Sequence, residues 1–391
     1  MTRERGVTLY AQAPAPLIVN CTGDTLTASG SGGIGTWVLG VSAAARVAGV
    51  DVRVLTKRHP HLPAALSDAV VLDYPHPPSL PGLALLDRST RRWLGHRHMA
   101  QPLWNARVTR FIGSLGPAPR SLIFNNDPEL AVVVARRFKQ HRVLHMLHNT
   151  DGFEPRWHGA FRDHVVPLAI SDFIARWLER HCNLDPGGVA TVHNGVDINA
   201  FVPAKKCEGR VVISYVGLFN ERKAPDLLLD AALRLAGSVP LFEVRLIGST
   251  HYGRAEVDAY GESLILRASE LRAAGVQVSM PGFLDRDALA RQLSTTDVIV
   301  VPSRCEEAFS LVALEGMASG AAAVVAGIGG LPEAVGTAGT MFHPGDSASL
   351  AAALSPLVSD PALLLRQQRF ARTWATTKTW DQTWRGLGVH M

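Results

Sequence analysis

Cysteine is scarce in this chain, and its positions form no familiar metal or disulfide pattern. The four cysteines, Cys21, Cys182, Cys207 and Cys305, are far apart and include no C-x-x-C pair. Their spacing excludes a zinc ribbon, and four cysteines in 391 residues exclude a disulfide-dense scaffold.

Targeting patterns and long apolar runs are also missing. The chain opens on Met-Thr-Arg-Glu-Arg and continues into a polar, proline-containing stretch, which is unlike a secretory signal. Apolar runs such as residues 321–330 are shorter than the roughly 20 residues that a membrane-spanning helix needs. We therefore expect a soluble, cytoplasmic protein.

Lysine is rare, whereas arginine is common. Lysine occurs six times, so 33 of the 39 basic residues are arginine, and the net charge is only +5 against 34 acidic residues. A modest excess in a chain of this length does not indicate a nucleic-acid surface. We expect no nucleic-acid partner, and the sequence indicates no particular oligomeric state.

What the chain does contain is a globular composition with alternating strand and helix signals. A hydrophobic content of 47% exceeds that of disordered chains, and 391 residues suggest two domains. A strand signal at 16–21, a glycine-rich loop at 30–35, a helical pattern at 36–48 and a second strand at 50–55 predict a βαβ unit. Further strands are expected at 121–125, 143–147, 166–170, 210–217, 242–247, 276–280, 297–301 and 322–325. The sequence thus predicts two parallel α/β domains.

The segment from Val301 to Gly320 has the strongest chemical pattern. A strand is expected to end at Pro302, followed by a loop that contains Glu307 and a helix that begins near Ser310. The free amides at such a helix start, those of Ser310, Leu311 and Val312, form a natural diphosphate cradle. Carboxylates beside a phosphate suit hydroxyl groups rather than the phosphate itself. Glu307 and Glu315 are therefore predicted to accept hydrogen bonds from a sugar or a ribose.

This segment resembles the E-x7-E motif of the retaining family-four glycosyltransferases. The flanking Pro-Ser before it and Gly-Met-Ala-Ser-Gly after it match as well. The resemblance implies the GT-B fold, two Rossmann-like, doubly wound parallel-sheet domains that face each other across a cleft. It places an acceptor domain at 1–203, a donor domain at 204–370, and a C-terminal helix at 371–391 that crosses back onto the first domain.

The same resemblance assigns the donor site and implies that Glu307, Lys223 and His148 are the catalytic residues. It implies that Glu307 faces the donor sugar, that Glu315 faces the ribose, and that Lys223 binds the diphosphate. The family has an arginine directly after the glycine that corresponds to Gly217, but this chain has Leu218 there. Arg222, which directly precedes Lys223, is a candidate replacement. The remaining donor-binding candidates are Ser310, Leu311, Val312, Phe309 and Gly33.

The N-terminal half contributes a histidine and an acceptor region. His148 follows a predicted strand and matches the family's histidine, which approaches the donor sugar or its phosphate, whereas His145 is expected to be buried. The acceptor candidates are Gly32, Gly35, Asp24, Asp127 and Asp151. A basic, aromatic segment at 88–111 instead suits weak association with a membrane surface or a phosphorylated acceptor, although a solvated helix is the simpler interpretation.

A D-x-D sequence at Asp285 and Asp287 is typical of a metal-held diphosphate in other glycosyltransferases. Here it precedes a helical pattern, so both aspartates are interpreted as helix-cap and first-turn residues. We expect no metal and no cofactor beyond a UDP- or GDP-linked sugar as co-substrate.

The resulting hypothesis is a retaining hexosyltransferase that uses a nucleoside-diphosphate sugar. Its acceptor would be a hydroxyl of a small polar molecule, such as a natural-product, cyclitol or sugar intermediate. Alternatives are a lipid-linked or cell-envelope acceptor, a sugar-nucleotide epimerase on the same fold, and a sugar-nucleotide binder without activity.

Overall fold

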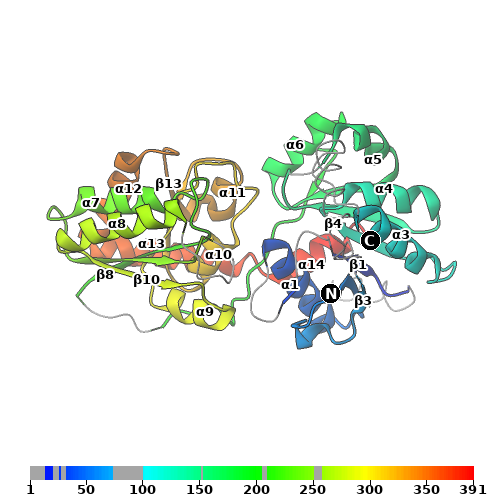
Figure 1. Cartoon of the computed structure of the whole chain (residues 1–391), viewed down its shortest axis with the longest axis horizontal. Coiled ribbons are helices and arrows are strands. Elements are labelled where there is room, and N and C mark those ends of the chain that lie inside the picture. Colours follow the sequence, from blue (N-terminus) through cyan, green and yellow to red (C-terminus); the bar gives the residue numbers. More distant parts are fainter. Residues whose placement is uncertain are drawn as a thin grey trace, which may run out of the picture. The chain divides into compact units, whose positions relative to one another are not determined.

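The computed structural model describes residues 14–20, 26–27, 32–73, 100–150, 153–204, 209–250 and 258–391. The chain divides into two compact units, each built around one parallel sheet (Figure 1). The first unit comprises residues up to 169, 176–190 and 387–391, and the second comprises 170–175 and 191–386.

The first unit contains a seven-stranded sheet in the order β3-β2-β1-β4-β5-β6-β7. Strands β1 to β6 pair in parallel, and each carries apolar residues that helices cover on both faces, as a parallel sheet requires. The strands are β1 (Leu17–Val19), β2 (Arg53–Lys57), β3 (Val70–Leu72), β4 (Ser121–Asn125), β5 (Arg142–Leu147), β6 (Val166–Ala169) and β7 (Ala190–Thr191).

Helices and short 3-10 turns connect these strands. Trp37, Trp104 and Phe161 are fully buried and anchor three of the helices in the core. The helical elements are α1 (Gly33–Val47), η1 (Ala64–Leu66), α3 (Ala100–Gly113), α4 (Pro128–Arg137), η2 (Pro155–Trp157), α5 (His158–His164) and α6 (Asp172–Cys182).

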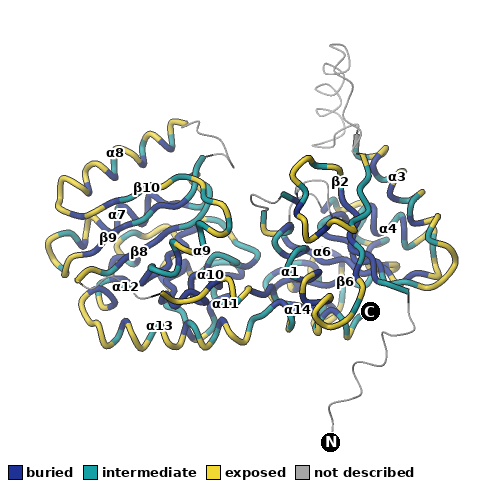
Figure 2. Tube along the Cα trace, turned by 90° about the horizontal axis from the view of Figure 1, so that it is seen from below, coloured by how far each residue is buried: buried dark blue, intermediate teal, exposed yellow. Residues whose placement is uncertain are grey.

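The second unit contains a six-stranded parallel sheet in the order β10-β9-β8-β11-β12-β13. The strands are β8 (Val211–Val216), β9 (Phe242–Ile247), β10 (Gln277–Gly282), β11 (Val298–Val301), β12 (Ala322–Ala326) and β13 (Gly339–Phe342). The helical elements are α7 (Pro225–Leu235), α8 (Ala259–Ala273), α9 (Arg286–Ser294), α10 (Leu311–Ala318), α11 (Leu331–Val335), η3 (Gly336–Ala338), α12 (Ser347–Ser359), α13 (Pro361–Thr376) and α14 (Trp380–Gly388). Burial follows the strands, while α8 and α13 keep an exposed outer face (Figure 2).

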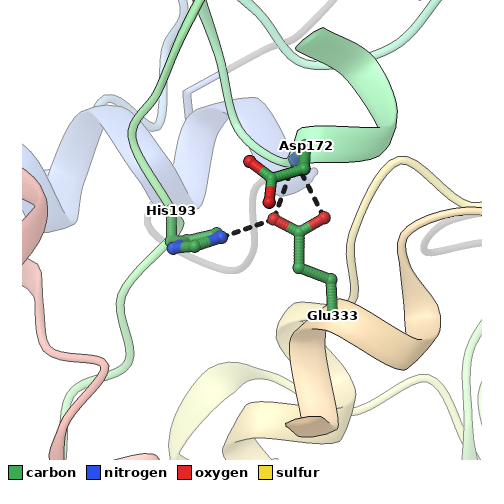
Figure 3. A group of neighbouring side chains, drawn as sticks. All are labelled: Asp172, His193 and Glu333. Atoms are coloured by element: carbon green, nitrogen blue, oxygen red, sulfur yellow. Dashed lines mark hydrogen bonds and ion pairs between the residues drawn. The ribbon is translucent and has the colours of Figure 1, made fainter. Parts of the chain in front are cut away.

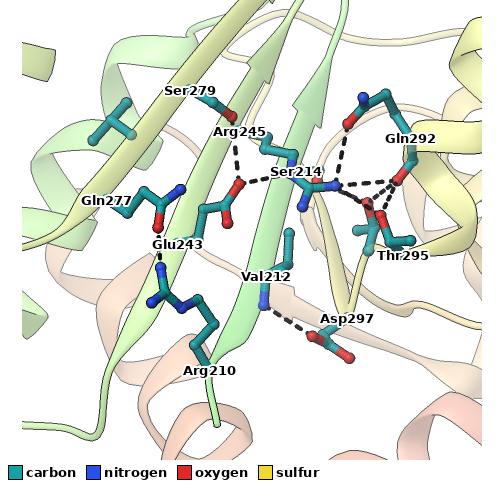
Figure 4. Close-up of polar contacts among 12 residues, drawn as sticks. Arg210, Val212, Ser214, Glu243, Arg245, Gln277, Ser279, Gln292, Thr295 and Asp297 are labelled. Carbon is teal, nitrogen blue, oxygen red and sulfur yellow. Dashed lines mark hydrogen bonds and ion pairs between the residues drawn. The ribbon is translucent and has the colours of Figure 1, made fainter. Parts of the chain in front are cut away.

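A polar network ties the strands of the second sheet together at their amino ends (Figure 4). Asp297, just before β11, accepts a hydrogen bond from the amide of Val212 at 2.9 Å. Arg245 pairs with Glu243 at 2.7 Å and also donates to Thr295 at 2.8 Å. These buried polar groups have partners inside the unit, so their role is structural, which leaves the opposite, carboxyl-end edge for ligand chemistry.

Helix capping explains several aspartates. Asp285 is the N-cap of α9 and accepts from the amide of Ala288 at 2.8 Å, while Asp287 lies in the first turn. The interpretation of this D-x-D sequence as cap and first-turn residues is confirmed.

The C-terminal segment differs from the expected single helix over 371–391. It contains the end of α13 and then α14, separated by the turn at Thr377–Thr379. The indole of Trp374 donates to the carbonyl of Ala334 at 2.9 Å, which fixes α13 within the second unit, and residues 387–391 group with the first unit. Three short strands, β3, β7 and β13, also lacked a sequence prediction.

The basic segment at 88–111 lies partly outside the described residues. Its described part forms most of α3, in which Trp104 and Val108 are fully buried and the Arg107 guanidinium donates to the carbonyl of Asp73. The membrane association of this segment stays a prediction.

Across the described residues, no single helix is both long and apolar enough to span a membrane. Helices α12 and α13 together meet the length and composition criteria, but they are bent by 106° at the break between them.

Candidate active site

An ion pair between Lys223 and Glu307 lies at the carboxyl-end edge of the second sheet. Lys223 Nζ is 2.5 Å from Glu307 Oε1 and 2.7 Å from Oε2. The Ser303 hydroxyl also donates to Glu307 Oε1 at 2.5 Å. The Glu307 side chain is 15% exposed and that of Lys223 is 37% exposed. The structure thus brings together two of the residues predicted for catalysis, although they are 84 residues apart in sequence.

The loop after β8 fixes the position of Lys223. Asn220 Oδ1 accepts from the Lys223 amide at 2.9 Å, and Ala224 adopts a left-handed conformation with φ of 53° as α7 begins. The amide of Arg304 donates to the carbonyl of Arg222 at 2.9 Å, which ties this loop to the loop containing Glu307. A non-glycine residue at positive φ is strained, and such strain persists where the surroundings hold it.

The start of α10 lies directly after the Glu307 loop. Ser310 is the N-cap, and its hydroxyl accepts from the Ala313 amide at 3.2 Å. The amides of Leu311 and Val312 precede any intrahelical acceptor, so they remain suited to an anion. Phe309 is buried and supports this turn rather than pointing to solvent.

Glu315 is buried inside α10 and pairs with an arginine. Its side chain is 5% exposed, and Oε1 lies 3.0 Å from the Arg286 guanidinium of α9. Burial raises the pKa of Glu315, and the neighbouring Arg286 partly offsets that rise. Arg286 also lies over the ring of Phe201 at 5.0 Å, which orients the guanidinium.

We expect Arg286→Met to destabilise the fold more at neutral than at acidic pH. Without Arg286 the pKa of Glu315 rises further, so the fold then favours the neutral carboxyl. That stability is present below the unfolded-state pKa and is lost as pH rises through the folded-state pKa. The expected loss is about 2 kcal/mol at pH 7, below the value for a fully buried pair because Arg286 is 38% exposed. Urea unfolding at pH 4.5 and 7 measures the difference, with Arg291→Met on the same helix as control. An equal loss at both pH values would contradict the assignment.

Two glycines press the following loop onto the backbone of Glu307. The Gly330 amide donates to the Glu307 carbonyl at 2.6 Å. A Cβ atom on Gly330 would lie 2.3 Å from the Ala308 carbonyl oxygen, and one on Gly329, whose φ is +61°, would lie 2.5 Å from the Glu307 oxygen. Neither position has room for a side chain, so this close contact requires glycine.

Asp172, His193 and Glu333 form a second polar cluster in the same unit (Figure 3). One potential ligand atom from each lies within 4.8 Å of the others, a spacing that a metal ion could use. The Glu333 carboxylate, however, already accepts from the Asp172 amide at 2.8 Å and from His193 Nε2 at 2.5 Å. Lys378 Nζ lies 3.3 Å from His193 Nδ1, and an ammonium there disfavours a second cation. The absence of a metal stays a prediction.

In the first unit, His148 follows β5 and is buried. Its Nε2 lies 2.9 Å from Asn125 Oδ1, and its amide donates to Asn126 Oδ1 at 2.7 Å. Burial lowers the pKa of His148 to about 3, so the ring is neutral at physiological pH. With Asn125 Oδ1 as acceptor, Nε2 carries the proton and Nδ1 can accept a hydrogen bond. A neutral imidazole suits contact with a hydroxyl rather than charge pairing with a phosphate.

The start of α1 contains the predicted glycines and lies near His148. Gly32 is the N-cap, Gly33 begins the helix and Gly35 is buried in its first turn. The Trp37 ring meets His148 edge-on at 5.2 Å, which places this end of α1 beside the histidine.

Asp127 has a structural role in its visible contacts. It is the N-cap of α4 and accepts from the Leu130 amide at 3.2 Å and from Gln101 Nε2 at 3.3 Å. Its assignment to the acceptor stays a prediction, and Asp24 and Asp151 lie outside the described residues.

His145 is buried as expected, and its ring has no hydrogen-bond partner among the described residues. Burial lowers its pKa to about 3, so the fold loses stability as pH falls below the unfolded value near 6.5. Between pH 7 and pH 5 the free energy of unfolding falls, and we expect this fall to be about 2 kcal/mol smaller in His145→Leu than in the wild type. Urea unfolding at both pH values tests this, with Leu144→Met as a control that changes no titratable group. An unchanged acid loss in His145→Leu would show that this ring does not cause it.

A known protein family matches part of the second unit. The sequence model described as "Glycosyl transferases group 1" matches residues 210–360, a range that includes Lys223, Glu307 and Glu315. Residues 210–360 are therefore similar to the glycosyl transferase group 1 family. The resemblance predicted from the E-x7-E segment is therefore confirmed.

Sequence relatives of this chain include proteins named D-inositol 3-phosphate glycosyltransferase. The protein from Mycobacterium avium is 33% identical over 231 residues, which cover 55% of this chain and 52% of that protein. The protein from Geodermatophilus obscurus is 34% identical over 224 residues, covering 54% and 48%. The matches thus span about half the length of these relatives.

Solved structures of similar fold cover nearly the whole chain. Sucrose-phosphate synthase from Thermosynechococcus elongatus has a TM-score of 0.71 at 20% identity, covering 96% of this chain and 98% of that chain. Anabaena HepE in complex with UDP has a TM-score of 0.69 at 16% identity, with the same coverage. Each of the two units contains one parallel α/β sheet, and these solved structures share the fold. The predicted GT-B class is therefore confirmed.

Several functional contacts of this domain were not predicted from the sequence. Ser303 belongs to the quoted motif, yet its hydrogen bond to Glu307 depends on the loop conformation. Arg286 was interpreted only as part of a capped helix, and its pairing with Glu315 follows from the packing of α9 against α10. The segment 326–333 resembles the family's loop that lines the donor pocket, but it did not predict the contacts of Glu333 with Asp172 and His193.

Proposed function

We propose that this chain is a retaining glycosyltransferase. It transfers a hexose or amino-hexose from a UDP- or GDP-linked sugar to a hydroxyl of a small polar acceptor, and it needs no metal. The observation that carries the proposal is the pairing of Lys223 with Glu307 beside the start of α10.

This arrangement separates two kinds of ligand chemistry. The Lys223 ammonium and the amides of Leu311 and Val312 are suited to a diphosphate. Glu307 accepts hydrogen bonds and repels phosphate, so it suits sugar hydroxyls, while the buried Glu315 suits those of a ribose. When the donor binds, its diphosphate replaces Glu307 as the partner of the Lys223 ammonium. The Glu307 oxygens are then available to accept hydrogen bonds from the sugar hydroxyls.

Charge stabilisation of the leaving group is the main catalytic contribution in this mechanism. The bond between the anomeric carbon and the phosphate oxygen breaks, and the bond to the acceptor oxygen forms on the same face. The acceptor proton passes to the departing diphosphate. Lys223 and the α10 amides stabilise the negative charge that develops, and fixed donors of this kind contribute several kcal/mol, about 3 for one group.

The family pattern includes a second cation at the diphosphate, an arginine, which this chain lacks at the usual position. Leu218 occupies the arginine position, and Arg304 is held by Asp226 through two hydrogen bonds of 2.9 and 2.6 Å. Arg222 is exposed and lies next to Lys223, so we assign it the role of the missing arginine.

Comparisons support the ligand classes in this proposal. Anabaena HepE has been solved in complex with UDP-glucose, and the sequence relatives are named for an inositol phosphate acceptor. A polyol or its phosphate therefore fits better than a lipid, and His148 with a neutral imidazole suits a hydroxyl-rich ligand.

A panel of nucleotide sugars tests the proposal. The protein is incubated with UDP- and GDP-linked hexoses, with EDTA present, and release of the nucleoside diphosphate is followed. We expect slow release from at least one donor and faster release when inositol phosphates or other polyols are added. No release from any donor would contradict the proposed function, and release that EDTA abolishes would contradict the absence of a metal.

A further inference from the structure

The Glu333 carboxylate holds a segment that is distant in sequence. Both of its oxygens accept from the Asp172 amide at 2.8 Å, and Oε2 also lies 3.4 Å from the Phe173 amide. These are the first amides of α6, where a carboxylate is favoured by the helix dipole. Residues 170–175 group with the second unit, although the chain on either side groups with the first.

The same glutamate is rigidly connected to the backbone of Glu307. It lies in α11, whose Leu331, Ala334 and Val335 are fully buried. This helix begins directly after Gly330, whose amide donates to the Glu307 carbonyl. Because α11 cannot shift without disturbing its core contacts, the position of Glu333 and that of Glu307 are linked.

A second contact leads from Glu333 to the same loop. His193 Nε2 donates to Glu333 Oε1, and the His193 ring lies 5.9 Å from the ring of Phe309, two residues after Glu307. Lys378 Nζ, 3.3 Å from His193 Nδ1, supports the tautomer with the proton on Nε2. Glu333 is thus connected to the loop that contains Glu307 by two indirect routes, one through α11 and Gly330 and one through the His193 ring.

We propose that Glu333 is a positioning residue for the donor-sugar carboxylate, Glu307. By anchoring α11 to the amides of Asp172 and Phe173 and to His193, it keeps the Gly330–Glu307 contact in place. The proposal rests on the proposed function, since it concerns the geometry of the same site. Lys223 is held separately by Asn220, so binding of the diphosphate depends less on Glu333 than sugar transfer does.

Removal of the Glu333 carboxylate is expected to change the position of Glu307 and not the charge beside the bond that reacts. In Glu333→Ala the amides of Asp172 and Phe173 and the His193 ring lose their acceptor. Helix α11 keeps its buried apolar contacts but loses its polar contacts to these groups. A displacement of about 1 Å in a catalytic group costs on the order of 100-fold in rate. In Glu333→Gln one oxygen still accepts from an amide, while the new amide group faces another N–H, so part of the anchoring is retained.

Kinetics, binding and hydrogen exchange on the full chain test the proposal. For Glu333→Ala we expect kcat for nucleoside-diphosphate release to fall at least about tenfold. The Kd of UDP or GDP, measured by titration calorimetry, should stay within about twofold because Asn220 holds Lys223 and the buried Leu314 and Met317 hold α10. Glu333→Gln should fall between the wild type and Glu333→Ala, and Glu270→Ala on the exposed face of α8 should match the wild type.

Hydrogen exchange separates this proposal from the proposed function. Glu333→Ala, or Glu333→Gln where the alanine variant does not fold, should exchange faster in peptides covering 172–175 and 303–310 but not in those covering 262–270. Unchanged exchange at 303–310 overturns the positioning role whether or not the protein is active. If the wild type is inactive with every nucleotide sugar but the Glu333 variant shows the expected faster exchange, only the proposed function is overturned. A kcat for Glu333→Ala within twofold of an active wild type, or an equal loss of nucleotide affinity and kcat, also overturns the positioning role.

Discussion

Lys223→Met is expected to lower the rate of nucleoside-diphosphate release by about 100- to 1000-fold. Methionine preserves the length and much of the volume of the side chain but removes the ammonium that lies 2.5 Å from Glu307. In the proposed mechanism this ammonium stabilises the departing diphosphate, and the loss of one such donor costs about 3 to 4 kcal/mol. Steady-state release from the best donor of the nucleotide-sugar panel measures the effect.

The matched control for this change is Lys139→Met. Lys139 is exposed in the first unit, so its substitution should leave both the rate and the stability unchanged. Lys223→Arg retains a cation and should recover part of the rate. A Lys223→Met variant that folds and works within threefold of the wild type would exclude Lys223 from leaving-group stabilisation.

Gly330→Ala is expected to disable the site by displacing the backbone of Glu307. The new Cβ atom would lie 2.3 Å from the Ala308 carbonyl oxygen and 2.9 Å from its carbon, and both are backbone atoms without freedom to rotate away. Relief of this overlap costs about 1–3 kcal/mol of stability. The accompanying loop shift should lower the rate on the order of 100-fold.

Gly159→Ala provides the comparison. Gly159 lies in α5 with open space around its Cβ position, so alanine there should stabilise the helix by about 0.5–1 kcal/mol. Chemical unfolding and donor turnover measured on both variants separate a local steric effect from a general effect of replacing glycine. A fully active and stable Gly330→Ala variant would show that the loop accommodates the methyl group, and the link from Gly330 to Glu307 would then be wrong.

Local sequence pattern was sufficient for the strands that carry the site. The apolar run before Pro302 and the polar loop after it predict a strand end, and β11 ends at Val301 with Ser310 as the N-cap of α10. Buried parallel strands consist of continuous apolar residues, so their signal is strong. Short edge strands such as β13 have half-exposed residues and a weaker signal.

The pairing of side chains across the second sheet could not be obtained from the sequence. Lys223 follows β8 and Glu307 follows β11, and these strands are neighbours only because the sheet order places β11 beside β8. The resemblance to a known family predicted that both residues serve the donor, but not that they pair with each other. Contacts of this kind depend on tertiary packing rather than on local propensity.

Helix capping was predicted for Asp285 but not for Asp127. Asp285 precedes a helical pattern without proline, whereas Asp127 precedes Pro128 and was assigned to the acceptor because it follows a strand. Aspartate before proline at the first helical position is also a common N-cap arrangement, so the residue types alone supported both interpretations.

The product balance of the reaction tests the central claim most directly. The protein is incubated with its best nucleotide sugar and a polyol acceptor, and the glycoside, the nucleoside diphosphate and the remaining donor are quantified by mass spectrometry and NMR. The account predicts one glycoside for each nucleoside diphosphate above the rate of donor hydrolysis, with the anomeric configuration of the donor retained. Conversion of the donor to an isomer without acceptor, an inverted glycoside, or a donor that is bound but never consumed would contradict it.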